Sequence, residues 1–181
     1  MLEADPRGEK VLRLPDDTLL KLFRQRRRIS RELFAPSAKR FARNALKLEL
    51  LGIRCPQVLA IYWLREPPCH LIRYKPVPGH SLRQRVPGID RDAQLALFAR
   101  LAVFIGYLHN QGVYFRSLHM GNIILTPDQY FGLIDIADMR CLDKPLSARL
   151  RARNYYHLLR YTDDWARVDS DVRTLFTFGK P

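Results

Sequence analysis

The sequence has few of the features that mark membrane-spanning, secreted or zinc-binding proteins. It contains no run of about 18 apolar residues, so no segment is expected to span a membrane. Its first residues, Met1 to Asp5, include no apolar stretch of the kind that a signal peptide needs. The cysteines are odd in number and none are spaced as C-x-x-C. This pattern favours reduced thiols in a cytoplasmic protein over disulfides or a zinc site.

Acidic residues are scarce relative to basic ones. The 181 residues include 31 Lys and Arg but 18 Asp and Glu, which gives a formal net charge of +13. This charge favours anionic partners, namely nucleic acid, acidic lipid headgroups or phosphorylated saccharides. No recognised RNA- or DNA-binding module accompanies the basic residues, so nucleic acid is the least favoured of the three. With 47% hydrophobic residues, the chain can bury a core and is not expected to be disordered.

A proline-rich hinge at residues 75–79, Lys-Pro-Val-Pro-Gly, divides the local patterns into two parts. The expected strands are residues 10–14, 18–23, 58–64, 70–74, 123–126 and 131–134. The expected helices are residues 38–51, 90–110 and 147–161. The order predicts an α+β protein. Its strand-rich N-terminal lobe with one helix would span residues 1–75, and its mainly helical lobe residues 76–181.

One stretch after the longest expected helix carries the candidate chemistry. Residues 114–125 read Tyr-Phe-Arg-Ser-Leu-His-Met-Gly-Asn-Ile-Ile-Leu, and Asn122 comes five residues after Ser117. Asp135 then begins a loop after a short apolar strand. An amide oxygen and a carboxylate are hard oxygen ligands of the kind that Mg²⁺ prefers. Asn122 and Asp135 are therefore the predicted metal ligands.

This arrangement resembles the catalytic loop of the protein-kinase fold, H-R-D-L-x-x-x-N, followed by the metal-binding Asp of D-F-G. Arg116, Leu118 and Asn122 fall in register, and Asp135 matches the D-F-G aspartate. Ser117 stands where the catalytic Asp should be. Within that superfamily the chain is similar to the lipopolysaccharide kinases, which phosphorylate Kdo or heptose of the inner core. The similarity covers about residues 10–160 and is strongest at 112–122 and 132–135.

The resemblance implies a small two-lobed kinase-like fold with a truncated C-terminal lobe, ATP and Mg²⁺ bound between the lobes, and phosphate transfer to a sugar hydroxyl. Lys21, inside an apolar strand, would bind phosphate; the alternative is an edge lysine whose charge reaches solvent. Arg116 would brace the loop. The implied partner is lipopolysaccharide core saccharide or another anionic envelope component. The implied location is cytoplasmic, with peripheral contact to the inner face of a Gram-negative inner membrane as an open alternative.

The serine at position 117 is the main departure from the kinase pattern. An unactivated serine is no general base near neutral pH, and losing general base catalysis typically costs about 10²–10⁴-fold in rate. Activity can survive such a loss, because phosphoryl transfer depends mostly on positioning and charge neutralisation. His119 is a candidate substitute base, or alternatively a structural residue of the loop. In the enzyme reading, Ser117 or His119 contacts the acceptor hydroxyl. Asp138 is a further candidate base, unless its side chain faces solvent.

Two other kinase features are weak, and they favour a second hypothesis. The nucleotide-covering G-x-G-x-x-G loop is missing, with only Gly8 upstream of the first clear strand. The helical Glu that should pair with Lys21 is ambiguous, because Glu32 precedes the helix, Glu49 lies near its end and Asn44 is near its middle. The alternative to an enzyme is therefore a catalytically impaired pseudokinase. It would bind nucleotide or a partner and regulate envelope biogenesis.

Remaining features have less specific interpretations. A basic run at residues 24–31 would bind phosphates of lipid or lipid-linked sugar, or would be a solvated loop without a ligand. Phe115 replaces the first kinase His and is expected to be an apolar buttress. Trp63 and Trp165 are expected to lie in the core or to pack between lobes.

Overall fold

The computed structural model describes residues 3–5, 8–24, 37–66 and 68–176. The chain forms two compact units, residues 1–77 and 78–181. The division falls inside the proline-rich segment, two residues beyond the boundary expected from the sequence. The protein is of the mixed α+β class, and its strand pairs are antiparallel.

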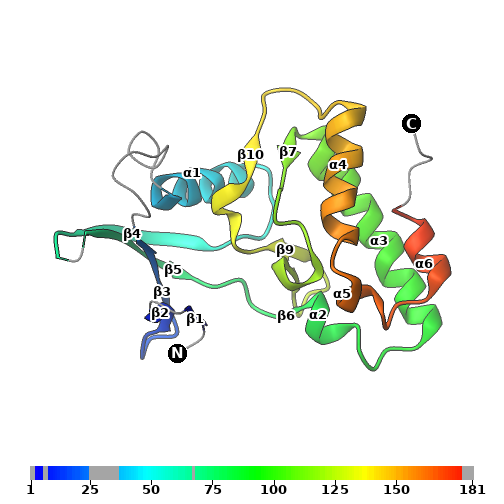
Figure 1. Ribbon diagram of the computed structural model, residues 1–181, viewed down its shortest axis with the longest axis horizontal. Helices are drawn as coiled ribbons and strands as arrows, with labels where there is room; N and C mark the ends of the chain where they lie inside the picture. Colours follow the sequence, from blue (N-terminus) through cyan, green and yellow to red (C-terminus); the bar gives the residue numbers. More distant parts are fainter. Residues whose placement is uncertain (1–2, 6–7, 25–36, 67, 177–181) are drawn as a thin grey trace. The chain divides into compact units, whose positions relative to one another are not determined.

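The first unit is built on a five-stranded antiparallel sheet of order β1-β2-β3-β5-β4 (Figure 1). Its strands are β1 (Glu3–Asp5), β2 (Gly8–Arg13), β3 (Leu19–Arg24), β4 (Gln57–Leu64) and β5 (Cys69–Lys75). The register of β3 and β5 runs from Leu19 opposite Tyr74 to Arg24 opposite Cys69. β3 is therefore an inner strand, with hydrogen-bonded neighbours on both sides.

Helix α1 (Ser37–Leu50) packs an apolar stripe against this sheet. Ala38, Phe41 and Leu48 recur at helical spacing and are almost fully buried. The ring of Phe41 lies 5.9 Å from that of Phe23 and 5.4 Å from that of Tyr74. These aromatic contacts fix α1 on the face of the sheet that carries Phe23.

The second unit is mainly helical. Its helices are α2 (Leu82–Arg85), α3 (Arg91–Asn110), α4 (Ala148–Leu159), α5 (Thr162–Trp165) and α6 (Ser170–Thr174). α3 begins at Asp90, whose side chain accepts the N–H of Ala93, and α4 begins at Ser147, whose hydroxyl accepts the N–H of Leu150. Phe98 of α3 packs on Trp165 with ring centroids 5.4 Å apart. Within the described residues, no helix combines the length and the apolar character that a membrane span requires.

Short strands and 3-10 turns form the rest of the second unit. One sheet has the order β6 (His80–Ser81), β8 (Ile123–Leu125) and β9 (Phe131–Leu133). A second pairs β7 (Val113–Tyr114) with β10 (Arg140–Cys141). The 3-10 turns are η1 (Met120–Asn122) and η2 (Ile136–Asp138). The β8–β9 hairpin directly follows η1 and precedes η2, so it joins the two candidate loops.

The tryptophans show where sequence reasoning succeeded and failed. Trp165 is 4% exposed and donates its indole N–H to the Leu158 carbonyl over 2.9 Å, as expected of a core residue. Trp63 is 47% exposed, so the first of its two expected places, the core, was wrong, and its packing between lobes stays a prediction. It lies on β4, an edge strand that turns most of its side chains outward, and it packs on the His70 ring at 4.6 Å. Most of the basic run, residues 25–31, lies outside the described residues.

Candidate functional site

The candidate catalytic loop is anchored by three apolar side chains. Phe115, Leu118 and Met120 are fully buried. Ser117 and His119, which alternate with them, are only partly buried. The anchors fix the backbone of the loop, so that the intervening polar side chains face out of the core. Phe115 is thus the apolar buttress that its position suggested.

The predicted metal ligands Asn122 and Asp135 are brought together by backbone pairing. Ile123 pairs with Leu133 across the β8–β9 hairpin, and the Ile134 N–H donates to the Asn122 carbonyl over 3.0 Å. Asp135 is the next residue after that bond. The Asn122 side chain is 8% exposed, and its Nδ2 donates to the Ser117 carbonyl over 3.0 Å. Asn122 therefore ties the candidate catalytic loop to the loop that carries Asp135.

The donor set at this point fits a magnesium ion shared with phosphate. Because the amide nitrogen of Asn122 bonds to Ser117, the amide oxygen is the atom that it can offer to a cation. Asp135 is exposed and adopts a left-handed backbone conformation with φ 54°, which is uncommon for a non-glycine residue. Across the described residues, no group of three or more His, Cys, Asp or Glu side chains could hold a metal ion. Mg²⁺ at phosphate-transfer sites needs only one or two carboxylates, because phosphate and water supply the other ligands.

Ser117 is bonded to a carboxylate from the second loop. Its Oγ–H donates to Asp138 Oδ2 over 2.6 Å. Asp138 is partly buried, and its Oδ1 is buried without a hydrogen-bond partner among the described residues. Burial is the main cause that raises the pKa of Asp138, while the Ser117 bond and the nearby Arg116 charge act against that rise. Asp138 therefore faces the catalytic loop and not solvent.

His119 is held as a neutral imidazole at the edge of the loop. Its Nδ1 accepts the Gly121 N–H over 3.1 Å, and its ring meets the Tyr161 ring edge to face at 4.7 Å. Burial first, and then the Arg83 guanidinium, lower the pKa of His119. Because Nδ1 accepts this bond within the loop, any proton that His119 took from a substrate hydroxyl would go to Nε2.

A cavity of about 580 Å³ in the second unit is lined in part by Arg83 and Tyr161, both of which contact the His119 ring. Its polar lining includes Arg83, Arg160, Tyr161, Asp164 and Arg167. Arg83 links the loop to this cavity, because its Nη2 lies 3.5 Å from the Nδ1 of His119 and donates to Asp164 Oδ2 over 3.0 Å. Arg160 lies over the Tyr161 ring at 4.7 Å. The lining carries three arginines, Arg83, Arg160 and Arg167, against two carboxylates, Asp163 and Asp164. Positive charge is therefore in slight excess, which suits a polar ligand that carries negative charge.

A buried asparagine that sequence reasoning missed braces the loop. Asn154 of α4 is 1% exposed, and its Nδ2 donates to the Phe115 carbonyl over 2.6 Å. Its Oδ1 lies 3.0 Å from His109 Nε2 on α3. The sequence does contain a signal for this role: Asn154 lies four residues after Leu150 and four before Leu158, so it shares their apolar side of the helix. Arg116, the predicted brace, is exposed, and the bracing bonds that the structure describes come from Asn154 and Asn122.

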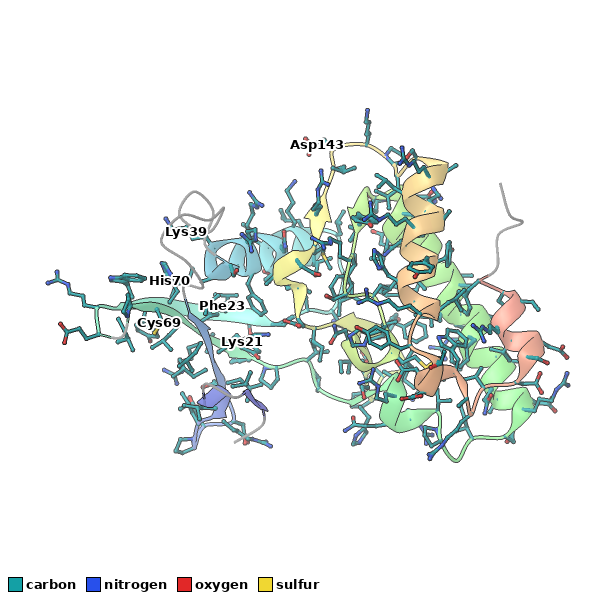
Figure 2. All side chains as sticks on the ribbon, viewed as in Figure 1. Lys21, Phe23, Lys39, Cys69, His70 and Asp143 are labelled. Atoms are coloured by element: carbon teal, nitrogen blue, oxygen red, sulfur yellow. The ribbon has the colours of Figure 1, made fainter. Side chains whose placement is uncertain are left out.

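Lys21 lies in the first unit, buried beside aromatic rings. It is 8% exposed, and Figure 2 labels it together with Phe23. Its Nζ lies 5.7 Å from the centroid of the Phe23 ring and 6.0 Å from that of the Phe41 ring. Because β3 is an inner strand, the alternative of an edge lysine that reaches solvent does not apply. The buried face of α1 presents Asn44, whereas Glu49 is exposed. Glu32, another candidate partner for Lys21, lies outside the described residues.

Comparison with known proteins adds no assignment to these observations. A scan against models of protein families finds no match, and a search of curated proteins finds none either. The geometry of the loops is therefore the basis for any functional proposal.

Proposed function

We propose that this protein is a small phosphotransferase with a two-lobed protein-kinase-like fold and a truncated C-terminal lobe. In this proposal it uses ATP and Mg²⁺, as the lipopolysaccharide core kinases do, and transfers phosphate to a sugar hydroxyl in envelope biogenesis. Asn122 and Asp135 hold Mg²⁺, and Lys21 binds a phosphate. Mg²⁺, when bound, neutralises charge on the phosphate oxygens.

The observation that carries the proposal is the pairing of the two candidate loops. The Asn122 amide is bonded to the Ser117 carbonyl, and the Asn122 carbonyl accepts the N–H of the residue before Asp135. One buried asparagine therefore connects the position of the missing base with the position of the second metal ligand. Two oxygen ligands from adjacent loops suit Mg²⁺ that is shared with phosphate.

The cavity beside His119 supports an anionic saccharide as the acceptor. Its volume of about 580 Å³ is in the range usual for small-molecule sites. Arg160 and Arg167 offer positive charge to a carboxylate or phosphate, and Tyr161 and Thr162 offer hydroxyls to a sugar. The net charge of +13 supports the same class of acceptor and peripheral contact with an anionic membrane surface.

A second candidate function is favoured by the residue at position 117. A serine there, in place of the kinase Asp, suits a pseudokinase that binds nucleotide or a partner and regulates envelope biogenesis. The two candidates share the nucleotide site and differ in turnover. Nucleotide binding without phosphate transfer would favour the pseudokinase.

The test is transfer of the γ-phosphoryl group of ATP to deacylated lipopolysaccharide core saccharide. Asp135→Ala removes the predicted carboxylate ligand, and Asp92→Ala is a matched control that removes another exposed carboxylate from the same unit. The proposal predicts magnesium-dependent transfer by the wild type and by Asp92→Ala, and none by Asp135→Ala. Equal transfer by both variants would contradict the metal assignment. No transfer by the wild type would contradict the enzyme and leave the pseudokinase.

A further inference from the structure

The contact between Ser117 and Asp138 joins two loops at the position where the proposed enzyme lacks its base. Ser117 Oγ donates to Asp138 Oδ2 over 2.6 Å, a length typical of a strong hydrogen bond to a carboxylate. The bond leaves the Ser117 oxygen lone pairs as acceptors, since its proton is already directed at Asp138. A hydroxyl held in this way can receive a proton on its outer side.

Asp138 is placed to receive a proton in turn. Its second oxygen, Oδ1, is buried and has no hydrogen-bond partner in the described part of the chain. A buried carboxylate oxygen without a hydrogen-bond partner lowers the stability of the fold. A neutral side chain with one oxygen could accept the Ser117 hydroxyl without that cost, so structure alone does not require an acid at position 138. The charges that act on Asp138 are Arg116, which favours its ionised form, and Asp135, which opposes it.

We propose that Asp138, acting through the Ser117 hydroxyl, supplies the carboxylate that position 117 lacks. This inference rests on the proposed phosphotransferase function. Ser117 is the residue that contacts the acceptor, and Asp138 is a positioning residue that orients Ser117 and takes its proton. The substitution at position 117 therefore moves the base to the neighbouring loop and does not remove it.

The acceptor hydroxyl oxygen forms a bond to the γ-phosphorus of ATP, and the bond from that phosphorus to the β–γ bridging oxygen breaks, leaving its electron pair on ADP. The acceptor proton passes to Ser117 Oγ while the hydroxyl proton of Ser117 passes to Asp138 Oδ2. Asp138 later releases this proton to solvent, and Ser117 returns to its starting state.

The experiment measures transfer of the γ-phosphoryl group from Mg·ATP to deacylated lipopolysaccharide core saccharide across a range of pH. Three variants remove the proposed relay: Asp138→Asn, Ser117→Ala and the double variant that combines them. A second double variant, called the exchange, carries Ser117→Asp together with Asp138→Ser. Asp135→Ala is the inactive reference. Each single variant is expected to lower turnover by about 10²-fold, within the usual range for general base catalysis. The combination is expected to lose no more than either single variant, because the two residues act as one unit. The exchange, which returns a carboxylate to position 117, is expected to recover at least a tenth of wild-type turnover.

The pH profile separates a proton-accepting role from a merely structural one. Wild-type turnover should fall at low pH as a carboxylate is protonated, and Asp138→Asn should lack this acidic limb. One outcome would overturn this inference and leave the proposed function standing. In it, Asp135→Ala is inactive, but Asp138→Asn turns over within about threefold of the wild type at every pH. Wild-type turnover no higher than that of Asp135→Ala overturns both. If Asp138→Asn does not fold, the exchange variant decides, and a folded exchange variant as slow as Ser117→Ala overturns the inference.

Discussion

Asn154 should contribute several kilocalories per mole to the stability of the second unit, because it joins three of its elements. It lies on α4, donates to the Phe115 carbonyl in the candidate catalytic loop and contacts His109 Nε2 on α3. All three residues are almost fully buried. Asn154→Ala removes both bonds at a site that water does not readily reach.

The expected loss of unfolding free energy depends on which hydrogen bonds remain to the Phe115 carbonyl and to His109 after the substitution. The Phe115 carbonyl also accepts the Leu118 N–H over 3.2 Å, so it loses one bond, worth about 0.5–1.5 kcal/mol, without being left unpaired. The Nε2 of His109 loses the partner that Asn154 provides, at a cost of about 1–3 kcal/mol. The sum is about 1.5–4.5 kcal/mol, which corresponds to a fall in Tm of about 3–18 °C for a chain of this length.

The assay is urea unfolding followed by Trp165 fluorescence. A Trp63→Phe background leaves Trp165, which is buried in the second unit, as the single tryptophan. Tyr156→Ala is the matched control, since it truncates a 67% exposed side chain of the same helix. It should change the unfolding free energy by no more than about 0.5 kcal/mol. If Asn154→Ala shifts the midpoint no more than Tyr156→Ala does, Asn154 is not a brace and this reasoning is refuted.

Two further predictions concern the same unit and use the same assay. Gly112→Ala should destabilise it by about 2–5 kcal/mol, because Gly112 has φ 74° and an added Cβ would collide with the Leu142 carbonyl oxygen. Gly106 lies in the interior of α3 with open space around it, so Gly106→Ala should instead raise the unfolding free energy by about 0.5–1 kcal/mol. A similar loss of unfolding free energy in Gly112→Ala and Gly106→Ala would contradict this expectation. Burial is the main cause that lowers the pKa of both His109 and His157 from the ordinary value of about 6.5. Below about pH 6.5 the unfolded chain therefore binds more protons than the folded chain does, so the unfolding free energy should be highest above that pH and fall below it. A urea midpoint that stays constant from about pH 7.5 to about pH 5.5 would contradict this.

Local pattern was sufficient to predict most of the elements. The helix expected at residues 90–110 is α3, Arg91–Asn110, because its apolar spacing and the capping Asp90 are both local signals. The strands expected at 123–126 and 131–134 are β8 and β9, each shorter by one residue at its end. Trp63 could not be placed in the same way, because exposure on an edge strand depends on which strands pair.

The candidate site was predictable only in part. Spacing along the chain indicated Asn122 and Asp135, and the hairpin between them brings their backbones together. The contact of Ser117 with Asp138, and the cavity beside His119, depend on how η2 and α5 fold back on the catalytic loop. Such contacts join residues 21 or more positions apart, and no periodicity along the chain encodes them. The spacing of Asn154 from Leu150 and Leu158 indicates the apolar side of the helix, but its partners Phe115 and His109 lie far away along the chain and could not be predicted from that spacing.

In the proposed function, Asn122 and Asp135 form a magnesium-dependent nucleotide site. Calorimetric titration with ATP, with and without Mg²⁺, tests it most directly on the wild type, Asp135→Ala and the control Asp92→Ala. We expect binding that requires Mg²⁺ in the wild type and in Asp92→Ala, and that is lost in Asp135→Ala. No binding at millimolar ATP, or equal binding by Asp135→Ala and the wild type, would contradict it.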